Sequence, residues 1–92
     1  MIQAFLHVSC EPGSIAKMGP VLADLNGVAE LYTTTGSLDF IAVVQVADVG
    51  VLADLITEGI ATVPGIRHTE THVAIRSYGR EDNAVAFDIG LD

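Results

Sequence analysis

The stretch LYTTTGSLDFIAVVQV, residues 31–46, decides the fold that this sequence predicts. Its first arm, residues 32–35, is aromatic and β-branched, and its second arm, residues 40–46, is almost wholly apolar, as is typical of two strands. Gly36 and Ser37 lie between the arms, and glycine tolerates the positive φ that a tight hairpin turn requires. The stretch therefore predicts an antiparallel β-hairpin with a Gly-Ser turn.

The second arm of this hairpin presents apolar side chains to both faces of its sheet. One face carries Phe40, Ala42, Val44 and Val46, and the other carries Ile41 and Val43 with Gln45. An antiparallel strand with one face in water normally alternates apolar with polar residues. Both faces are therefore expected to be covered. Because so short a chain cannot cover both, Ile41 and Val43 are predicted to lie in an interface between two copies.

The composition favours the same interpretation. The chain has 92 residues, of which 50% are hydrophobic and 17% charged, and its mean hydropathy is +0.49. A domain of this size buries only about 60 to 65% of the surface of its unfolded chain. This much apolar content would leave a monomer with an exposed apolar patch, which usually marks an interface. We therefore expect residues 1–92 to form a single, self-associating domain.

The charge balance argues against direct nucleic-acid binding. The formal net charge is -8, from 12 acidic and 4 basic residues, whereas binding a phosphate backbone requires clustered lysine and arginine. Apolar runs fall short of the roughly 18 residues of a membrane helix, and the start of the chain does not resemble a signal segment. The single Cys10 fits a reducing compartment. We expect a cytoplasmic protein.

The order of predicted elements indicates an α+β fold. Strands are expected at residues 2–9, 28–35, 40–46 and 66–77, and helices at residues 15–25 and 49–63. This β-α-β-β-α-β order is the ferredoxin-like pattern, a four-stranded antiparallel sheet with two helices on one face. In the last strand, the odd-numbered residues are expected to face inward.

Local signals place the ends of the two helices. Ser14 and Asp48 are good N-cap residues, and Asn26-Gly27 and Pro64-Gly65 supply the stops. Pro20 lies inside the first helical pattern, where it removes a backbone hydrogen bond. We therefore expect a kink there, or a helix that properly begins at Pro20.

Several short motifs follow one another in a distinctive order. They are Leu25-Asn26-Gly27-Val28, then the loop from Tyr32 to Asp39, then Val63-Pro64-Gly65-Ile66 followed by Thr69-Glu70-Thr71. The ordered set has T-G-x-x-D at the hairpin and T-x-T on the last strand. It resembles, over about residues 2–77, the effector-binding domain of the Lrp/AsnC transcription regulators. That domain is also called RAM, for regulation of amino-acid metabolism.

The resemblance implies partners and an assembly. It implies a free amino acid or a related metabolite as ligand, no cofactor, and homodimers that assemble further, with an octamer as the expected size. The sequence begins at the first strand of the domain, so it resembles stand-alone members without the helix-turn-helix domain. A full-length Lrp/AsnC regulator is then a candidate partner. Residues 78–92 form a C-terminal arm outside the match, with a short helix expected at 81–87 and Phe87, Ile89 and Leu91 available to a neighbouring subunit.

The resemblance also implies a ligand site at the hairpin, where T-G-x-x-D lines a pocket between dimers in the family. Its residues would be Thr35, Gly36, Ser37, Asp39, Thr69 and Thr71. A free amino acid needs one acidic acceptor for its ammonium and several donors for its carboxylate. Asp39 would bind the ammonium, and the loop amides with the threonine hydroxyls would bind the carboxylate. In the plainer alternative, Asp39 caps backbone amides of its turn and the threonines are ordinary strand residues.

Catalytic and metal sites find less support in the sequence. His68 and His72 are four residues apart on a strand, about 13 Å, which is too far to share one ion, although His7 can approach His72 if the outer strands are neighbours. Cys10 beside His7 lacks an orienting third group for a nucleophile. We therefore expect no catalytic residue and no metal. The alternative function is a dimeric α+β barrel enzyme, of monooxygenase or isomerase type, acting on a small organic substrate.

Overall fold

The computed structural model describes residues 1–79 and confirms the β-α-β-β-α-β order. The strands are β1 (Ile2–Cys10), β2 (Val28–Thr33), β3 (Phe40–Val46) and β4 (Ile66–Val73). The helical segments are α1 (Ile15–Ala23), α2 (Val49–Asp54), η1 (Leu55–Gly59) and η2 (Ile60–Thr62). The short helix expected at residues 81–87 and the apolar residues Phe87, Ile89 and Leu91 lie outside the described part of the chain.

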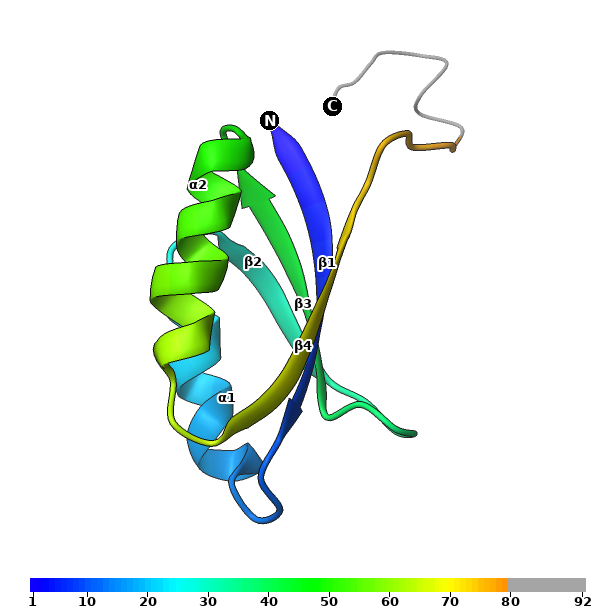
Figure 1. The fold of residues 1–92 in the computed structure, drawn as a ribbon. Helices are drawn as coiled ribbons and strands as arrows, with labels where there is room; N and C mark the ends of the chain where they lie inside the picture. The colour runs from blue at the N-terminus through cyan, green and yellow to red at the C-terminus, as the bar shows by residue number, and fades with distance from the viewer. Residues whose placement is uncertain (80–92) are drawn as a thin grey trace.

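The four strands form one antiparallel sheet in the order β2-β3-β1-β4 (Figure 1). The helices cover one face of this sheet and leave the other face bare. This is the predicted ferredoxin-like architecture. The central pair is β1 and β3, with Leu6 opposite Ala42 and His7 opposite Ile41. The bare face is therefore lined by alternate residues of the two central strands.

The core lies between the sheet and the helices. Every second residue of the two central strands is buried in it: Ala4, Leu6, Val8, Cys10, Phe40, Ala42, Val44 and Val46. The helical segments contribute Met18, Leu22, Leu52, Leu55 and Ile60. Removing a leucine side chain from water stabilises a fold by about 1.5–3 kcal/mol. The period-two burial confirms the face assignment that the apolar pattern of residues 40–46 predicted.

The first helix differs in detail from its prediction. Ser14 is the N-cap, but its hydroxyl donates to the Glu11 carbonyl at 2.6 Å and does not accept from a helical amide. The helix includes Pro20 rather than beginning at it, and ends at Ala23 rather than near residue 25. A Cβ at Gly19 would lie 3.8 Å from the Phe40 ring, which is an ordinary van der Waals contact. The helix therefore packs closely on β3, and its Met18 and Leu22 are buried in the core.

The second helical region begins as predicted and then changes its winding. Asp48 is the N-cap, and its Oδ1 accepts the Val51 amide at 2.9 Å. After Asp54 the chain continues as a π turn and a 3-10 turn, η1 and η2, instead of one regular helix. These turns keep Leu55 and Ile60 in the core.

Two predicted boundaries are corrected by pairing between strands. The tight Gly-Ser turn is a longer loop, residues 34–39, in which the Thr34 amide donates to the Asp39 carbonyl at 3.2 Å. β4 ends at Val73 and not near residue 77. Its ladder finishes where the Ala74 amide donates to the Gln3 carbonyl at 2.8 Å. β1 begins at Ile2, so it offers little backbone for a longer β4.

Candidate ligand site at the β2–β3 loop

The loop at residues 34–39 holds four of the six predicted ligand residues. It projects from one end of the sheet, beyond β2 and β3 (Figure 1). Thr35, Gly36 and Ser37 are exposed, and Asp39 is half-buried. Gly36 has a φ of +101°, and a Cβ built on it would meet no atom within 4 Å. The backbone at Gly36, at the tip of the loop, is therefore not covered by any other part of residues 1–79.

Asp39 has a structural partner on the neighbouring strand. Its Oδ2 accepts the Cys10 amide at 2.8 Å, and its own amide donates to the Val8 carbonyl at 3.1 Å. The pairing register of β1 with β4 shifts between Ser9 and Cys10. The carboxylate thus satisfies a backbone amide where the sheet becomes irregular. It caps an amide, as in the plainer interpretation of Asp39, but across the sheet rather than within its own turn.

Cys10 lies next to this carboxylate and is not activated by it. Its Sγ is 3.7 Å from Asp39 Oδ2. Burial raises the pKa of the Cys10 thiol; a hydrogen bond with Ser14 opposes this, and the nearby Asp39 charge raises the pKa further. Nucleophilic cysteines need a lowered pKa, so the raised pKa of Cys10 argues against a nucleophilic role.

Thr69 and Thr71 lie on β4 and are separated from the loop by β1. Thr69 pairs with Val8 and Thr71 with Leu6, while Phe40 pairs with Val8 on its other side. Neighbouring strands are about 4.8 Å apart, so Thr69 lies about 10 Å from β3. Both threonines are half-buried opposite core residues, as expected for the odd-numbered residues of the last strand, whereas Val73 and Ile75 are exposed. Within one chain, the fold does not place them beside the loop.

The bare face of the sheet combines apolar and histidine side chains. Phe5, Ile41 and Val43 are half-buried there. The rings of His7 and His72 meet edge-to-face, with centroids 4.9 Å apart, which confirms that His7 approaches His72. His72 Nε2 lies 2.8 Å from Glu70 Oε2. Within residues 1–79, no three histidine, cysteine or acidic side chains are grouped to hold a metal ion.

Tyr32 and Glu30 extend this face onto β2. Tyr32 pairs with Ile41 and Glu30 with Val43. The hydrogen bond with Glu30 and the charge of that carboxylate raise the pKa of the Tyr32 phenol. Tyr32 is 52% exposed. A large aromatic side chain with a polar tip, left uncovered beside Ile41, is the kind of residue that is enriched at protein interfaces.

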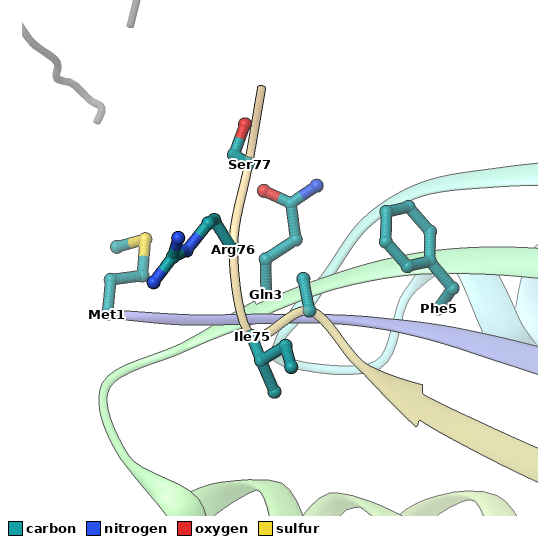
Figure 2. Close-up of a pocket in the computed structure, with 7 residues that line it drawn as sticks. Met1, Gln3, Phe5, Ile75, Arg76 and Ser77 are labelled. Carbon is teal, nitrogen blue, oxygen red and sulfur yellow. The ribbon is translucent and has the colours of Figure 1, made fainter.

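A pocket at the opposite end of the sheet was missed from the sequence. It has a volume of about 330 Å³ and lies between the start of β1 and the segment that follows β4. Arg76 is the basic residue of its lining, which also includes Gln3 and Phe5 of β1 (Figure 2). The only sequence signal was the scarcity of basic residues, 4 in the whole chain, which makes the position of each one informative.

No helix in the described part of the chain is both long and apolar enough to cross a membrane.

Comparison with known proteins gives the affiliation of the chain. An uncharacterized HTH-type transcriptional regulator of Pyrococcus abyssi is 34% identical over 80 residues, which are 85% of this chain and 51% of that protein. The chain thus spans about half the length of the curated relative it matches. The crystal structure of a protein from Thermus thermophilus is 39% identical, with a TM-score of 0.83, over 87% of this chain and all of that one.

A more distant structure shares the fold alone. It is a transcriptional regulator of Neisseria meningitidis in complex with L-Met, 15% identical, with a TM-score of 0.75, over 86% of this chain and 53% of that one. The family model described as "Lrp/AsnC ligand binding domain" matches residues 3–84. Because that match takes in nearly the whole of the chain, the protein belongs to the Lrp/AsnC ligand-binding domain family.

Proposed function

We propose that this protein is a small-molecule sensor that binds a free amino acid or a related metabolite and assembles through its bare sheet face. Membership of the Lrp/AsnC ligand-binding domain family carries this proposal. The L-Met complex of the Neisseria regulator supports the ligand class. The protein acts in the cytoplasm, in the regulation of amino-acid metabolism.

The ligand site is proposed at the tip of the β2–β3 loop, where a second dimer would close it. The amides of Gly36 and Ser37 suit a carboxylate, and the free oxygen of Asp39 suits an ammonium, since the Cys10 amide occupies Oδ2 alone in the described chain. In one chain, β1 separates Thr69 and Thr71 from the β2–β3 loop. These threonines would therefore contact only a ligand bound at the loop of another subunit. Such a shared site couples the ligand to assembly, because the ligand favours the assembly that completes it.

The proposed assembly begins with a dimer. Two copies pack their bare faces together and bury Ile41 and Val43. These dimers then associate further, four to a ring. The half-buried apolar strip at the centre of an otherwise uncovered face supports this arrangement, because monomers seldom leave contiguous apolar surface in water.

A non-catalytic role is favoured over the alternative of a dimeric α+β barrel enzyme. An enzyme of that kind requires polar groups in a pocket between helices and sheet. Within residues 1–79, no polar or charged residue is buried, and that interior is filled by aliphatic side chains with Phe40, Met18 and Cys10. In the proposed function, the protein therefore binds its ligand without catalysing a reaction on it.

A thermal-shift panel of the amino acids tests the proposal. A ligand present at 100 times its dissociation constant stabilises the folded state by about 2.7 kcal/mol. One amino acid, or a small group of similar ones, is expected to raise the melting temperature, while glycerol and inorganic phosphate at equal concentration do not. If no amino acid or related metabolite stabilises the protein, the sensor function is refuted.

A further inference from the structure

All three histidines of the protein lie on the bare face of the sheet. They are His7 on β1 and His68 and His72 on β4. Their neighbours along each strand, such as Val8 and Thr71, lie on the helix side, because successive side chains of a strand alternate between faces. Histidine is the side chain whose charge ordinarily changes between about pH 5 and pH 8. The charge that histidine contributes in this range is therefore confined to the face through which two copies are proposed to pack.

His7 has the most central position of the three. β1 is an inner strand of the sheet, whereas β4 is an outer one. His7 is half-buried and lies opposite Ile41 of β3, and its neighbour on the same face of β1 is the half-buried Phe5. Figure 2 shows Phe5 on the side of β1 away from the helix. His68 and His72 are exposed. A second copy that covers Ile41 would therefore also cover His7.

Two ionisable side chains of β4 face His7. Glu70 is its partner in the pairing of β1 with β4, and the His72 ring meets the His7 ring edge-to-face, with 4.9 Å between centroids. The Glu70 carboxylate is already engaged by His72, whose Nε2 lies 2.8 Å from Oε2. On its other side, His7 faces the uncharged Ile41 of β3. The other ionisable side chains of this face lie farther away, on β2 or farther along β4: Glu30, Tyr32 and His68.

A second copy on this face makes a charge on His7 costly. Burial removes water from a protonated imidazole and so disfavours the charged form of histidine. The carboxylate nearest to His7 is shared with His72, so protonation of both rings sets two positive charges against one negative charge. In a symmetric dimer each copy brings the same excess. Glu30 and Glu70 are exposed on the outer strands, where water at the rim can hydrate them.

We propose that the bare-face dimer is proton-sensitive, and that protonation of His7 releases the two copies. This inference rests on the proposed packing of the bare faces and adds a regulation of that assembly by pH. Because the proton binds the separate chain better than the dimer, the dimer is favoured at about pH 8 and weakened as the pH falls toward about 5. The fold itself should tolerate this change, since no polar or charged residue is buried within residues 1–79.

Sedimentation velocity of the full chain at about pH 8 and about pH 5.5 tests the release. The dissociation constant of the dimer is expected to rise at least tenfold at the lower pH, while the far-UV circular dichroism stays the same. An equal or smaller dissociation constant at the lower pH would overturn the proposal, and so would a lost dichroism signal, because acid would then act by unfolding the chain. A chain that is already monomeric at the higher pH would contradict the bare-face dimer itself.

Histidine variants test which residue senses the proton. His7→Phe keeps an aromatic ring and His7→Gln keeps a polar side chain, but neither can be protonated. Each is expected to have dissociation constants within twofold of one another at the two pH values. His68→Gln is the matched control, because it removes a histidine from the outer strand of the same face and should respond to pH like the parent. If both His7 variants still dissociate in acid, or if His68→Gln abolishes the response, the assignment to His7 is wrong.

Discussion

The Asp39 carboxylate accepts the backbone amide of Cys10 at 2.8 Å, although the two residues are 29 positions apart in the chain. The contact joins the beginning of β3 to the end of β1, where the pairing of β1 with β4 becomes irregular. Asp39, which the family resemblance assigns to the ligand site, therefore stabilises the sheet. This contact and the proposed binding of an ammonium can be separated, because only one carboxylate oxygen accepts the Cys10 amide.

Replacing Asp39 in two ways separates these roles. Asp39→Ala leaves the Cys10 amide without its acceptor and should cost about 1–3 kcal/mol of unfolding free energy. Asp39→Asn keeps an acceptor oxygen and should cost less, yet it removes the charge that an ammonium needs. In urea denaturation, the alanine variant should thus be the less stable. In a thermal-shift assay, both should lose stabilisation by the amino acid. If Asp39→Asn keeps the full ligand-induced shift, Asp39 does not bind the ammonium.

The bare face of the sheet is expected to be the dimer interface. Val43→Asp would bury a carboxylate there, at a cost of several kcal/mol, and should give a monomer by light scattering at micromolar concentration. Val51→Asp is the matched control, because Val51 is 43% exposed on α2, away from that face. A dimeric Val43→Asp variant would show that another surface joins the two copies.

The protein alone is expected not to bind DNA in a salt-sensitive way. Salt-sensitive binding depends on lysine and arginine side chains that neutralise phosphates and release their counterions. A protein with a net charge of -8 has few such side chains. Any regulatory effect would then require a partner that carries a helix-turn-helix domain. The check is a gel-shift or polarisation assay with a DNA duplex at about 50 mM salt, in which retention of the duplex by the purified protein would contradict this expectation.

Two glycines with similar backbone conformations should respond differently to alanine. Gly36 has φ of +101° and Gly65 has φ of +98°, so each substitution incurs the left-handed backbone cost of about 1–2 kcal/mol. A Cβ at Gly65 would also lie 2.8 Å from Met18 Cε in the core, whereas one at Gly36 meets nothing within 4 Å. Gly65→Ala should therefore be the more destabilising in urea denaturation. Equal losses would mean that Met18 moves aside freely.

The interior of the fold could be predicted from local patterns. The alternation in residues 40–46 indicated which side chains are buried, because neighbouring side chains of a strand point to opposite faces. Asp48 was predicted as a cap because an N-cap carboxylate needs only the amides of the next turn, and Val51 supplies one. The motifs at residues 25–28 and 63–66 indicated the family because each is a short contiguous stretch that can be recognised in the sequence.

Features that depend on distant residues required the tertiary structure. β4 was expected to reach residue 77 from its own composition, but a strand needs a partner, and its ladder ends at Gln3. A tight hairpin turn was predicted, but the structure has a longer loop. In this loop the Asp39 amide donates a hydrogen bond to the Val8 carbonyl of β1.

The β2–β3 loop and the pocket that includes Arg76 differ in the same way. The loop at residues 34–39 is one contiguous stretch, so its sequence could indicate it by resemblance. The Arg76 pocket joins residues from the two ends of the described chain, and no local pattern relates them. Sequence by itself determined the elements and their faces, because those follow from the order of side chains along the backbone. Only the tertiary structure decided which amide Asp39 caps and where Arg76 lies, because both depend on which strands become neighbours.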